Sequence, residues 1–134
     1  MQAMTIGKLA KESEVNVETI RYYERRGLIK QPAERRGAFR IYSSETAARV
    51  RSIKRAQSLG FSLKEIKELM TLRLDERAMC CDVLVQTEKK IAEIDEKLRS
   101  LRSVKRQLTR LASACREEAP VSECPILEAF DGGS

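Results

Sequence analysis

The sequence predicts an all-α-dominated fold: an N-terminal winged helix-turn-helix with a small β-hairpin wing, followed by a long helix that pairs in an antiparallel dimerisation coiled coil. Two short helical patterns separated by a tight turn precede a segment that contains Pro32 and Gly37. Beyond them, apolar side chains recur every 3.5 positions for about four and a half heptads. We therefore divide the chain into a winged helix-turn-helix domain at residues 1–72, a hinge at 73–79, a dimerisation helix at 80–115, and a loop with a short C-terminal helix at 116–134.

The positive charge of the chain is concentrated in its N-terminal part. The 134 residues include 26 Lys and Arg and 20 Asp and Glu, which gives a net charge of +6. Residues 1–55 hold 13 basic and 6 acidic side chains, a net charge of +7, whereas residues 56–134 hold 13 and 14, a net charge of −1. A basic N-terminal part is typical of a protein that binds a polyanion such as double-stranded DNA.

The chain contains no histidine, which removes the commonest general base and every zinc site built with imidazole. We therefore expect that the protein is not an enzyme. No apolar run approaches the roughly 18 residues of a membrane-spanning helix, and the N-terminus lacks the apolar stretch of a signal peptide. We expect a cytoplasmic protein with no membrane partner.

The first two predicted helices form the helix-turn-helix. Thr5 precedes apolar residues at helical spacing and is expected to cap a helix that ends near Ser13. Asn16 is expected to cap a second helix that stops at Gly27. Two short helices joined by such a tight turn are the pattern of a helix-turn-helix.

The hairpin and two further helices complete the N-terminal part. Residues 28–42 predict a β-hairpin with a basic tip, because a proline and a glycine lie between two short apolar pieces. A third helix is expected from Ser43 or Ser44 to Gly60, and a capping box of Ser62 and Glu65 opens a fourth. The residues expected to point inward from these two helices are Ala47, Val50, Ile53, Ala56, Leu63, Ile66, Leu69 and Met70.

The long helix carries one apolar seam, in which Thr87 and Lys105 are flaws. Because one chain cannot bury such a seam alone, we expect a homodimer. The apolar residues expected to form the dimer seam are Leu84, Ile91, Ile94, Leu98, Leu101 and Leu108.

The second helix and the hairpin carry side chains suited to phosphate contacts, because guanidinium groups and tyrosine hydroxyls are good partners of phosphate oxygens. A helix-turn-helix places its second helix in the major groove, where the hairpin flanks it as a wing. The alternative is a charged face that only contacts solvent. The residues expected to contact DNA are Val17, Thr19, Arg21, Tyr22, Tyr23, Arg40 and Tyr42.

The cysteines lie at the two ends of the predicted long helix. Cys80 and Cys115 share one seam position but are roughly 50 Å apart within one chain, at about 1.5 Å per residue. In an antiparallel dimer that crosses near Leu98, Cys80 of one subunit meets Cys115 and Cys124 of the other. Two symmetric three-thiolate sites result, with Cys81 as a spectator or spare ligand because it points about 100° away. The alternative is that Cys80, Cys81 and Cys115 are small buried seam residues.

Several segments of the N-terminal part are distinctive: TIGKLAK, VNVETIRYYERRGLI, FRIY and IKRAQSLGFSLKEIKEL. Over essentially the first 72 residues, they resemble the MerR family of bacterial transcriptional regulators. The remainder has a long helix with a cysteine at its start, a second cysteine at its end and a third in the segment CPIL. This part resembles the mercury-responsive members of the same family.

The resemblance implies a dimer that represses its promoter without metal. With metal it distorts the DNA until RNA polymerase engages both promoter elements. It also implies that the protein controls mercury-resistance genes and holds two Hg(II) per dimer, each on Cys80 of one subunit and on Cys115 and Cys124 of the other. Thiolates without imidazole favour soft ions, so that cadmium, lead and copper(I) remain alternatives.

Two other classes of protein explain part of the sequence. A thiol enzyme would need an activated cysteine, and Cys115 lies among Lys105, Arg110 and Arg116, yet no catalytic base or oxyanion site is visible. A plain coiled-coil scaffold would account for the seam but not for the winged helix-turn-helix. A metal-responsive DNA-binding regulator accounts for both parts.

Overall fold

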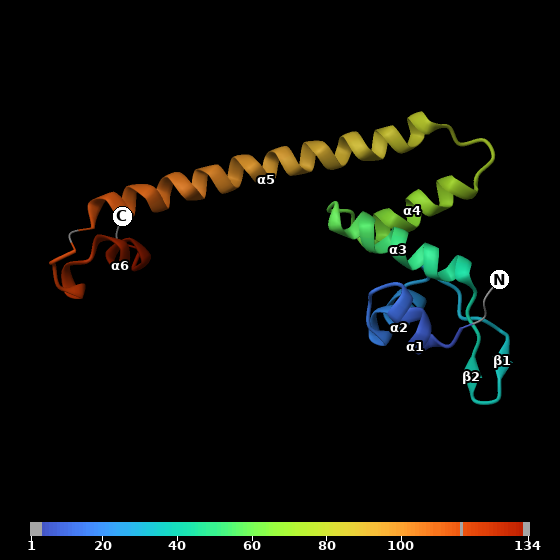
Figure 1. Cartoon of the computed structure of the whole chain (residues 1–134). Coiled ribbons are helices and arrows are strands. Elements are labelled where there is room, and N and C mark those ends of the chain that lie inside the picture. Colours follow the sequence, from blue (N-terminus) through green and yellow to red (C-terminus); the bar gives the residue numbers. More distant parts are fainter. Residues whose placement is uncertain (1–3, 116, 133–134) are drawn as a thin grey trace. The chain divides into compact units, whose positions relative to one another are not determined.

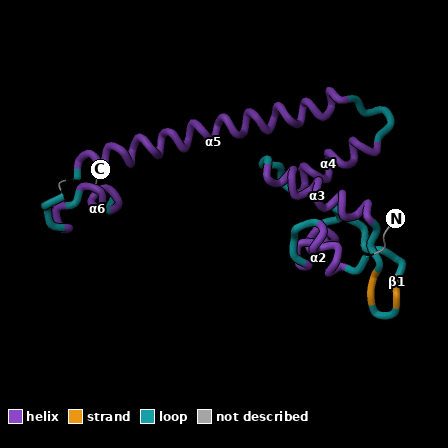
Figure 2. The backbone as a smooth tube through the Cα atoms, in the orientation of Figure 1, coloured by secondary structure: helices purple, strands orange, loops and turns teal. Residues whose placement is uncertain are grey.

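The computed structural model describes residues 4–115 and 117–132 (Figures 1 and 2). It is mostly helical, with one short antiparallel hairpin and a long helix toward the C-terminus, which confirms the predicted fold class for the single chain. The elements in chain order are α1 (Ile6–Glu12), α2 (Val17–Arg25), β1 (Arg35–Arg36), β2 (Phe39–Arg40), α3 (Ser44–Ser58), α4 (Leu63–Leu74), α5 (Cys80–Ala114), the 3-10 turn η1 (Val121–Glu123) and α6 (Pro125–Phe130).

The chain forms two compact units that divide between Thr87 and Glu88. The first unit contains α1 to α4, the hairpin and the first turns of α5. The second contains the rest of α5 with η1 and α6. None of the helices in the described ranges is long and apolar enough to cross a membrane.

Polar side chains cap the helices of the first unit where the sequence predicts them. At the start of α4, the Glu65 backbone N–H donates to Ser62 Oγ at 3.1 Å, and the Ser62 N–H donates to Glu65 Oε1 at 2.8 Å. These reciprocal bonds satisfy two backbone donors that a helix start leaves without partners. The N-cap residues of the first four helices are Thr5, Asn16, Ser43 and Ser62.

The turn between α1 and α2 is held from the third helix. Glu14 adopts a left-handed backbone conformation with φ of 57°, which is uncommon for a residue with a side chain. Lys54 Nζ on α3 donates to the Glu14 carbonyl oxygen at 2.7 Å. The lysine therefore fixes the tight turn of the helix-turn-helix against α3.

The hairpin is shorter than residues 28–42, with two residues in each strand. Arg35 pairs with Arg40, and Arg36 pairs with Phe39. Gly37 has a φ of +61°, the left-handed value that the first position of a two-residue hairpin turn requires. This hairpin, from 35 to 40, is called the wing below.

One aliphatic core holds the first unit together. The largest fully buried side chains come from α1, α2, α3 and the segment after α2: Leu9, Ile20, Leu28, Val50 and Ile53. Ala47 and Ile66 are also buried, whereas Ala56, Leu63 and Met70 are partly buried and pack against this core. Burial of these groups is the main stabilising term, at about 25 cal/mol per Å² of apolar surface.

The long helix α5 presents an apolar stripe that the single chain leaves exposed. Leu98, near its middle, has 42% of its surface exposed. The other predicted seam residues are similarly exposed: Leu84, Ile91, Ile94, Leu101 and Leu108. A row of exposed large apolar side chains at heptad spacing is typical of a helix that packs against a partner.

Candidate nucleic-acid interface and cysteine positions

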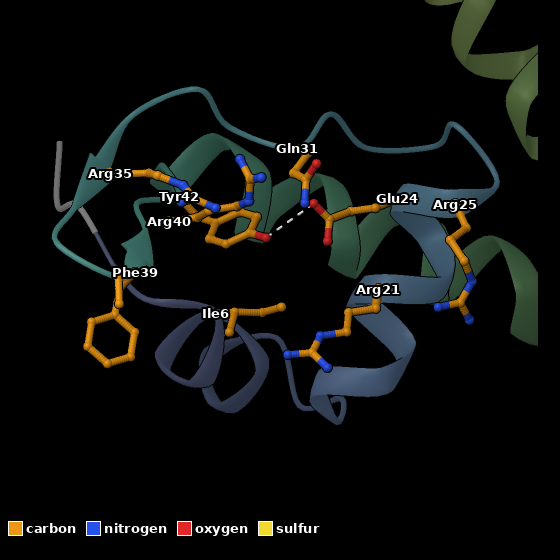
Figure 3. A pocket seen from close by; sticks show the side chains of 10 residues that line it. Ile6, Arg21, Glu24, Arg25, Gln31, Arg35, Phe39, Arg40 and Tyr42 are labelled. Carbon is orange, nitrogen blue, oxygen red and sulfur yellow. Dashed lines mark hydrogen bonds between the residues drawn. The ribbon is translucent and has the colours of Figure 1, made fainter.

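A basic groove lies between the second helix and the wing (Figure 3). It has a volume of about 660 Å³ and is lined from α2 by Arg21 and Arg25 and from the wing by Arg35 and Arg40. Four guanidinium groups around one groove favour contacts with an anionic backbone, because guanidinium pairs with phosphate through planar, charge-assisted hydrogen bonds.

The arginines of this groove differ in how firmly they are held. Arg40 Nη1 donates to the Pro32 carbonyl oxygen at 2.8 Å and is partly buried, so this side chain braces the base of the wing. Among the described residues, the one ion pair of Arg21 is a long, exposed one with Glu18, at 3.5 Å between Nη1 and Oε1. Exposed ion pairs of this kind contribute little to stability. Arg21 can therefore leave Glu18 and turn toward a phosphate at a small cost in free energy.

The front of α2 carries the residues predicted to read DNA. Thr19 is hydrogen-bonded to the N-cap residue of α2: its N–H and its hydroxyl both donate to Asn16 Oδ1, at 2.8 and 3.0 Å. Val17 is half-buried and packs against the core. Both residues belong to the first turn of α2, and the Asn16 cap fixes the direction in which this helix starts.

The three tyrosines have different surroundings. Tyr22 is 39% exposed, and the guanidinium groups of Arg25 and Arg26 each lie 5.8 Å from its ring centroid. Tyr23 and Tyr42 are only 2% exposed. These two side chains therefore pack in the core, and their contact with DNA stays a prediction.

The hydroxyls of the two buried tyrosines are hydrogen-bonded within the protein. Tyr23 Oη donates to Gln57 Oε1 on α3 at 2.5 Å, and Tyr42 Oη donates to Glu24 Oε2 on α2 at 3.2 Å. Burial raises the pKa of Tyr23. Burial, and then the neighbouring carboxylate of Glu24, raises the pKa of Tyr42 to about 12. Both phenols are therefore neutral donors at physiological pH.

Sequence reasoning missed Glu24, Gln57 and Phe39 as parts of this region. Glu24 lies between Arg21 and Arg25 on α2, and an acidic residue between two candidate phosphate contacts was a usable signal. Phe39 lines the groove next to the wing arginines and is largely exposed. Gln57 accepts its bond across 34 residues of sequence, which no local pattern reveals.

The four cysteines are free and lie at the ends of α5 and at the start of α6. Cys80 and Cys81 begin α5, and Cys115 follows its last residue; all three are exposed. Cys124 directly precedes α6 and is half-buried. Within one chain, the described ranges contain no cluster of three His, Cys, Asp or Glu residues arranged to hold a metal ion. The predicted three-thiolate site draws on two chains.

Cys80 also borders a second groove, within the first unit. This groove has a volume of about 460 Å³, and its lining is mostly apolar. It lies among α3, α4 and the start of α5, and its lining includes Ala56, Ile66, Met70, Cys80 and Val83. A ligand bound at Cys80 would therefore act next to the helices that support the helix-turn-helix.

Two family models match the chain. Residues 4–72 match the model described as MerR HTH family regulatory protein, and residues 47–111 match the model described as MerR, DNA binding. A mercuric resistance operon regulatory protein of Bacillus cereus is 43% identical over 123 residues, which cover 92% of this chain and 93% of that protein.

Two solved structures resemble the whole chain. The transcription regulator PbrR691 from Ralstonia metallidurans CH34, in complex with lead(II), has a TM-score of 0.84 and 33% identity, with 95% of this chain and 98% of that chain covered. The dual function transcriptional regulator MerR from Bacillus megaterium MB1, in complex with mercury(II), has a TM-score of 0.71 and 41% identity, with 96% and 99% covered.

Proposed function

This chain belongs to the MerR family of helix-turn-helix transcription regulators, and we propose on that footing that it is a metal-responsive regulator of mercury-resistance genes. Members of the family are DNA-binding regulators and not enzymes, in agreement with the prediction from the sequence. In this proposal the dimer represses its promoter without metal. When Hg(II) binds, the dimer distorts the promoter DNA so that RNA polymerase can use this promoter.

The basic groove supports the DNA-binding part of the proposal. With α2 in the major groove, the wing reaches the flanking backbone, as in other winged helix-turn-helix proteins. Arg21 and Arg40 then lie on the two walls that face the phosphates. The exposed Tyr22 hydroxyl accepts from Arg26 Nη1 at 3.3 Å and can donate its own proton to the same backbone.

The observation that carries the metal-sensing part is the placement of the cysteines. Cys80 begins α5, Cys115 follows its last residue, and Cys124 directly precedes α6, so that thiols lie at both ends of α5 and in the segment after it. Three thiolates without any imidazole suit a soft thiophilic ion. When bound, Hg(II) would supply a strong link between the Cys80 thiolate of one subunit and the Cys115 and Cys124 thiolates of the other.

The proposed homodimer pairs α5 with α5 in antiparallel orientation. The exposed apolar stripe provides the contact, and the charges along α5 support the direction. Residues 80–98 hold five acidic and three basic side chains, whereas residues 99–114 hold five basic and no acidic side chains. Antiparallel pairing places the half with a net charge of −2 beside the half with a net charge of +5, whereas parallel pairing would place the two +5 halves together.

Mercury is the proposed inducer, at two ions per dimer. The relative from Bacillus cereus is a mercuric resistance operon regulator, and the similar Bacillus megaterium structure holds mercury(II). PbrR691 holds lead(II), so lead is the second candidate, followed by cadmium and copper(I). All four ions accept thiolate ligands.

The position of Cys80 suggests how metal binding reaches the DNA. Only residues 75–79 separate the end of α4 from Cys80, and Cys80 borders the groove formed with α3 and α4. Drawing Cys80 toward thiols of the other subunit therefore pulls on α4 through a five-residue connection. In the proposal this pull turns the two DNA-binding units relative to each other and changes the twist of the bound promoter.

A mixed dimer tests the shared site. One subunit carries Cys80→Ser, and the other carries both Cys115→Ser and Cys124→Ser. Such a dimer retains the three thiols of one complete site, and it should bind one Hg(II) tightly, measured by competition against a thiol buffer. A dimer of two Cys80→Ser subunits is the negative control.

A site formed within one chain would be lost from both subunits of the mixed dimer. Absence of tight mercury binding there would reject the shared site. Cys81→Ser is the matched control, because it removes a neighbouring thiol and should leave binding and induction intact. Competition among Hg(II), Pb(II), Cd(II) and Cu(I) on the wild-type dimer then ranks the candidate inducers.

A further inference from the structure

We infer that Glu24 and Tyr42 form a positioning pair that sets the second helix against the wing, and that neither residue itself contacts DNA. The inference rests on the proposed function in one respect: α2 and the wing bind the same duplex. It gives Tyr42 a different role from the direct DNA contact predicted from the sequence. It also gives a role to Glu24, an acidic residue in a groove otherwise suited to phosphate.

The first step is that Tyr42 is fixed in place. Its side chain is 2% exposed and belongs to the core. Its backbone pairs with Met4 on both sides: the Met4 N–H donates to the Tyr42 carbonyl oxygen at 2.9 Å, and the Tyr42 N–H donates to the Met4 carbonyl oxygen at 2.7 Å. The bridge fixes the Tyr42 backbone, and burial in the core holds the phenol, which cannot reach a phosphate without leaving that core.

The second step is that the Tyr42 hydroxyl joins the two walls of the groove. It donates to Glu24 Oε2 at 3.2 Å (Figure 3). Glu24 belongs to α2, whereas Tyr42 ends the segment that carries the wing. Among the described residues, this is the one side-chain hydrogen bond between α2 and residues 28–42. The core packs α2 and residues 28–42 together, and this bond adds a directional link between the two DNA-contacting walls.

The third step concerns charge. The groove is lined by Arg21, Arg25, Arg35 and Arg40, and the Glu24 carboxylate opposes their attraction for phosphate. For the Tyr42 hydroxyl, however, a carboxylate is a stronger acceptor than a neutral side chain would be, because a hydrogen bond to an ionised group is roughly twice as strong as one between neutral groups. The same negative charge repels a phosphate from the Tyr42 hydroxyl. Both effects fit a residue that holds the walls together and does not contact the nucleic acid.

The fourth step is the consequence for recognition. A duplex is bound well only when α2 and the wing make their contacts at the same time. A groove whose walls are fixed in advance loses less conformational freedom on binding, which improves affinity without an added contact. Removal of the bond should therefore weaken binding while the number of neutralised phosphates stays the same.

The experiment combines a salt series with a double-mutant cycle. The probe is a duplex that the full-length wild-type dimer selects from a randomised pool, and affinity is measured by fluorescence anisotropy. Tyr42→Phe removes only the hydroxyl. Glu24→Ala and Glu24→Gln both remove the charge, but only the alanine also removes the acceptor, so the glutamine variant is the matched control.

Tyr42→Phe should weaken binding about 5-fold in the wild-type background, the size expected for one intramolecular hydrogen bond, and by a smaller factor in the Glu24→Gln background, where the acceptor is neutral. In the Glu24→Ala background it should weaken binding less than about 2-fold, because the bond is already absent. The slope of log K against log salt should not change with Tyr42→Phe. Arg35→Ala, which removes an exposed wing charge, should flatten that slope by about one.

Two results would overturn the positioning pair while leaving the proposed function in place. One is a salt slope that flattens by about one with Tyr42→Phe, which would mean a direct phosphate contact. The other is an equal loss in the alanine and glutamine backgrounds, which would mean that the two residues are not coupled. If Tyr42→Phe does not fold, the DNA affinities of Glu24→Ala and Glu24→Gln still test the bond. Neither variant changes a core residue, and only the alanine removes the acceptor. A wild-type dimer that selected no duplex would overturn the proposed function and this inference together.

Discussion

At the scale of single residues, Ser13 stands out because its buried hydroxyl has no hydrogen-bond partner among the described residues. Its side chain lies at the C-cap of α1 and is almost fully buried. A buried polar group without a partner costs about 1–3 kcal/mol of desolvation. The site is nevertheless small, so that alanine fits without a large cavity.

We expect Ser13→Ala to raise the free energy of unfolding, by about 1 kcal/mol, or to leave it unchanged. Urea unfolding followed by circular dichroism measures the change. Ser43→Ala is the matched control: it removes the N-cap of α3, whose Oγ accepts from the Thr46 N–H at 3.3 Å, and should lower stability by about 1 kcal/mol. A loss of stability with Ser13→Ala equal to that of the control would show that the buried hydroxyl has a partner.

The raised pKa of Tyr42 predicts a loss of stability in alkaline solution. Below the ordinary tyrosine pKa of about 10, the phenol is protonated in both folded and unfolded states, and its contribution is fully present. As the pH rises from about 10 toward the folded-state pKa of about 12, the unfolded chain releases this proton first, so that stability falls.

The measurement is urea unfolding between pH 9 and about 11 for wild type and Tyr42→Phe. The wild type should lose more stability over this interval, because only it carries the phenol whose proton the fold retains. Lysine titration affects both proteins and cancels in the comparison. An equal loss in both would contradict the prediction.

The helix caps could be predicted from the sequence better than the directions of the tyrosine side chains could. The caps at Asn16 and Ser62 follow from local hydrogen bonding, which sequence records directly. Tyr23 lies three residues after buried Ile20, so its inward position could have been read from helical spacing. The hydroxyl of Tyr42 depends on a partner 18 residues away, and nothing local specifies such a contact.

At the scale of elements, the helix boundaries were well predicted, whereas the predicted hairpin was too long. Residues 28–42 were expected to form it, yet the ladder includes only Arg35 to Arg40. Pro32 has no N–H to donate to a ladder, and its carbonyl oxygen is bound by Arg40. The flanking apolar residues Leu28 and Ile29 pack in the core instead of forming strands.

The apolar stripe of α5 gives the element-scale prediction. In the proposed dimer, Leu98→Ala should weaken association by about 2–5 kcal/mol for each buried side chain, and Leu98→Lys should give monomers. Val85 is the matched control, because it is exposed on the same helix but lies outside the heptad seam. Val85→Lys should leave the dimer intact in sedimentation velocity. A wild-type protein that is monomeric at micromolar concentration would contradict the proposed dimer.

At the scale of the whole molecule, metal ions that join two subunits should stabilise the dimer against dilution. With free Hg(II) at about 100 times its Kd, each site contributes about 2.7 kcal/mol. The protein concentration at half-dissociation should then fall roughly 100-fold for each site. Sedimentation of fluorescently labelled protein in a thiol-buffered mercury series measures this shift.

Cys124→Ser supplies the control for dilution, because it removes one ligand that lies outside the dimer seam. It should abolish most of the mercury-dependent shift and leave the metal-free dimer unchanged. A metal site within single chains would give no shift with either protein. The sequence indicates which thiols to change, whereas the proposed site draws on two chains, and within one chain the described residues form no such cluster.

The unequal distribution of charge along α5 has a consequence for partner choice. A bacterium that carries several regulators of one family faces the hazard of mixed dimers, which would join unlike sensors on unlike promoters. In the proposed antiparallel dimer, the basic half from Arg99 to Arg110 lies beside the acidic half of the partner, which disfavours pairing with a chain that lacks the same order of charges. The same residues that orient the helix would thus keep this signalling circuit insulated from its relatives.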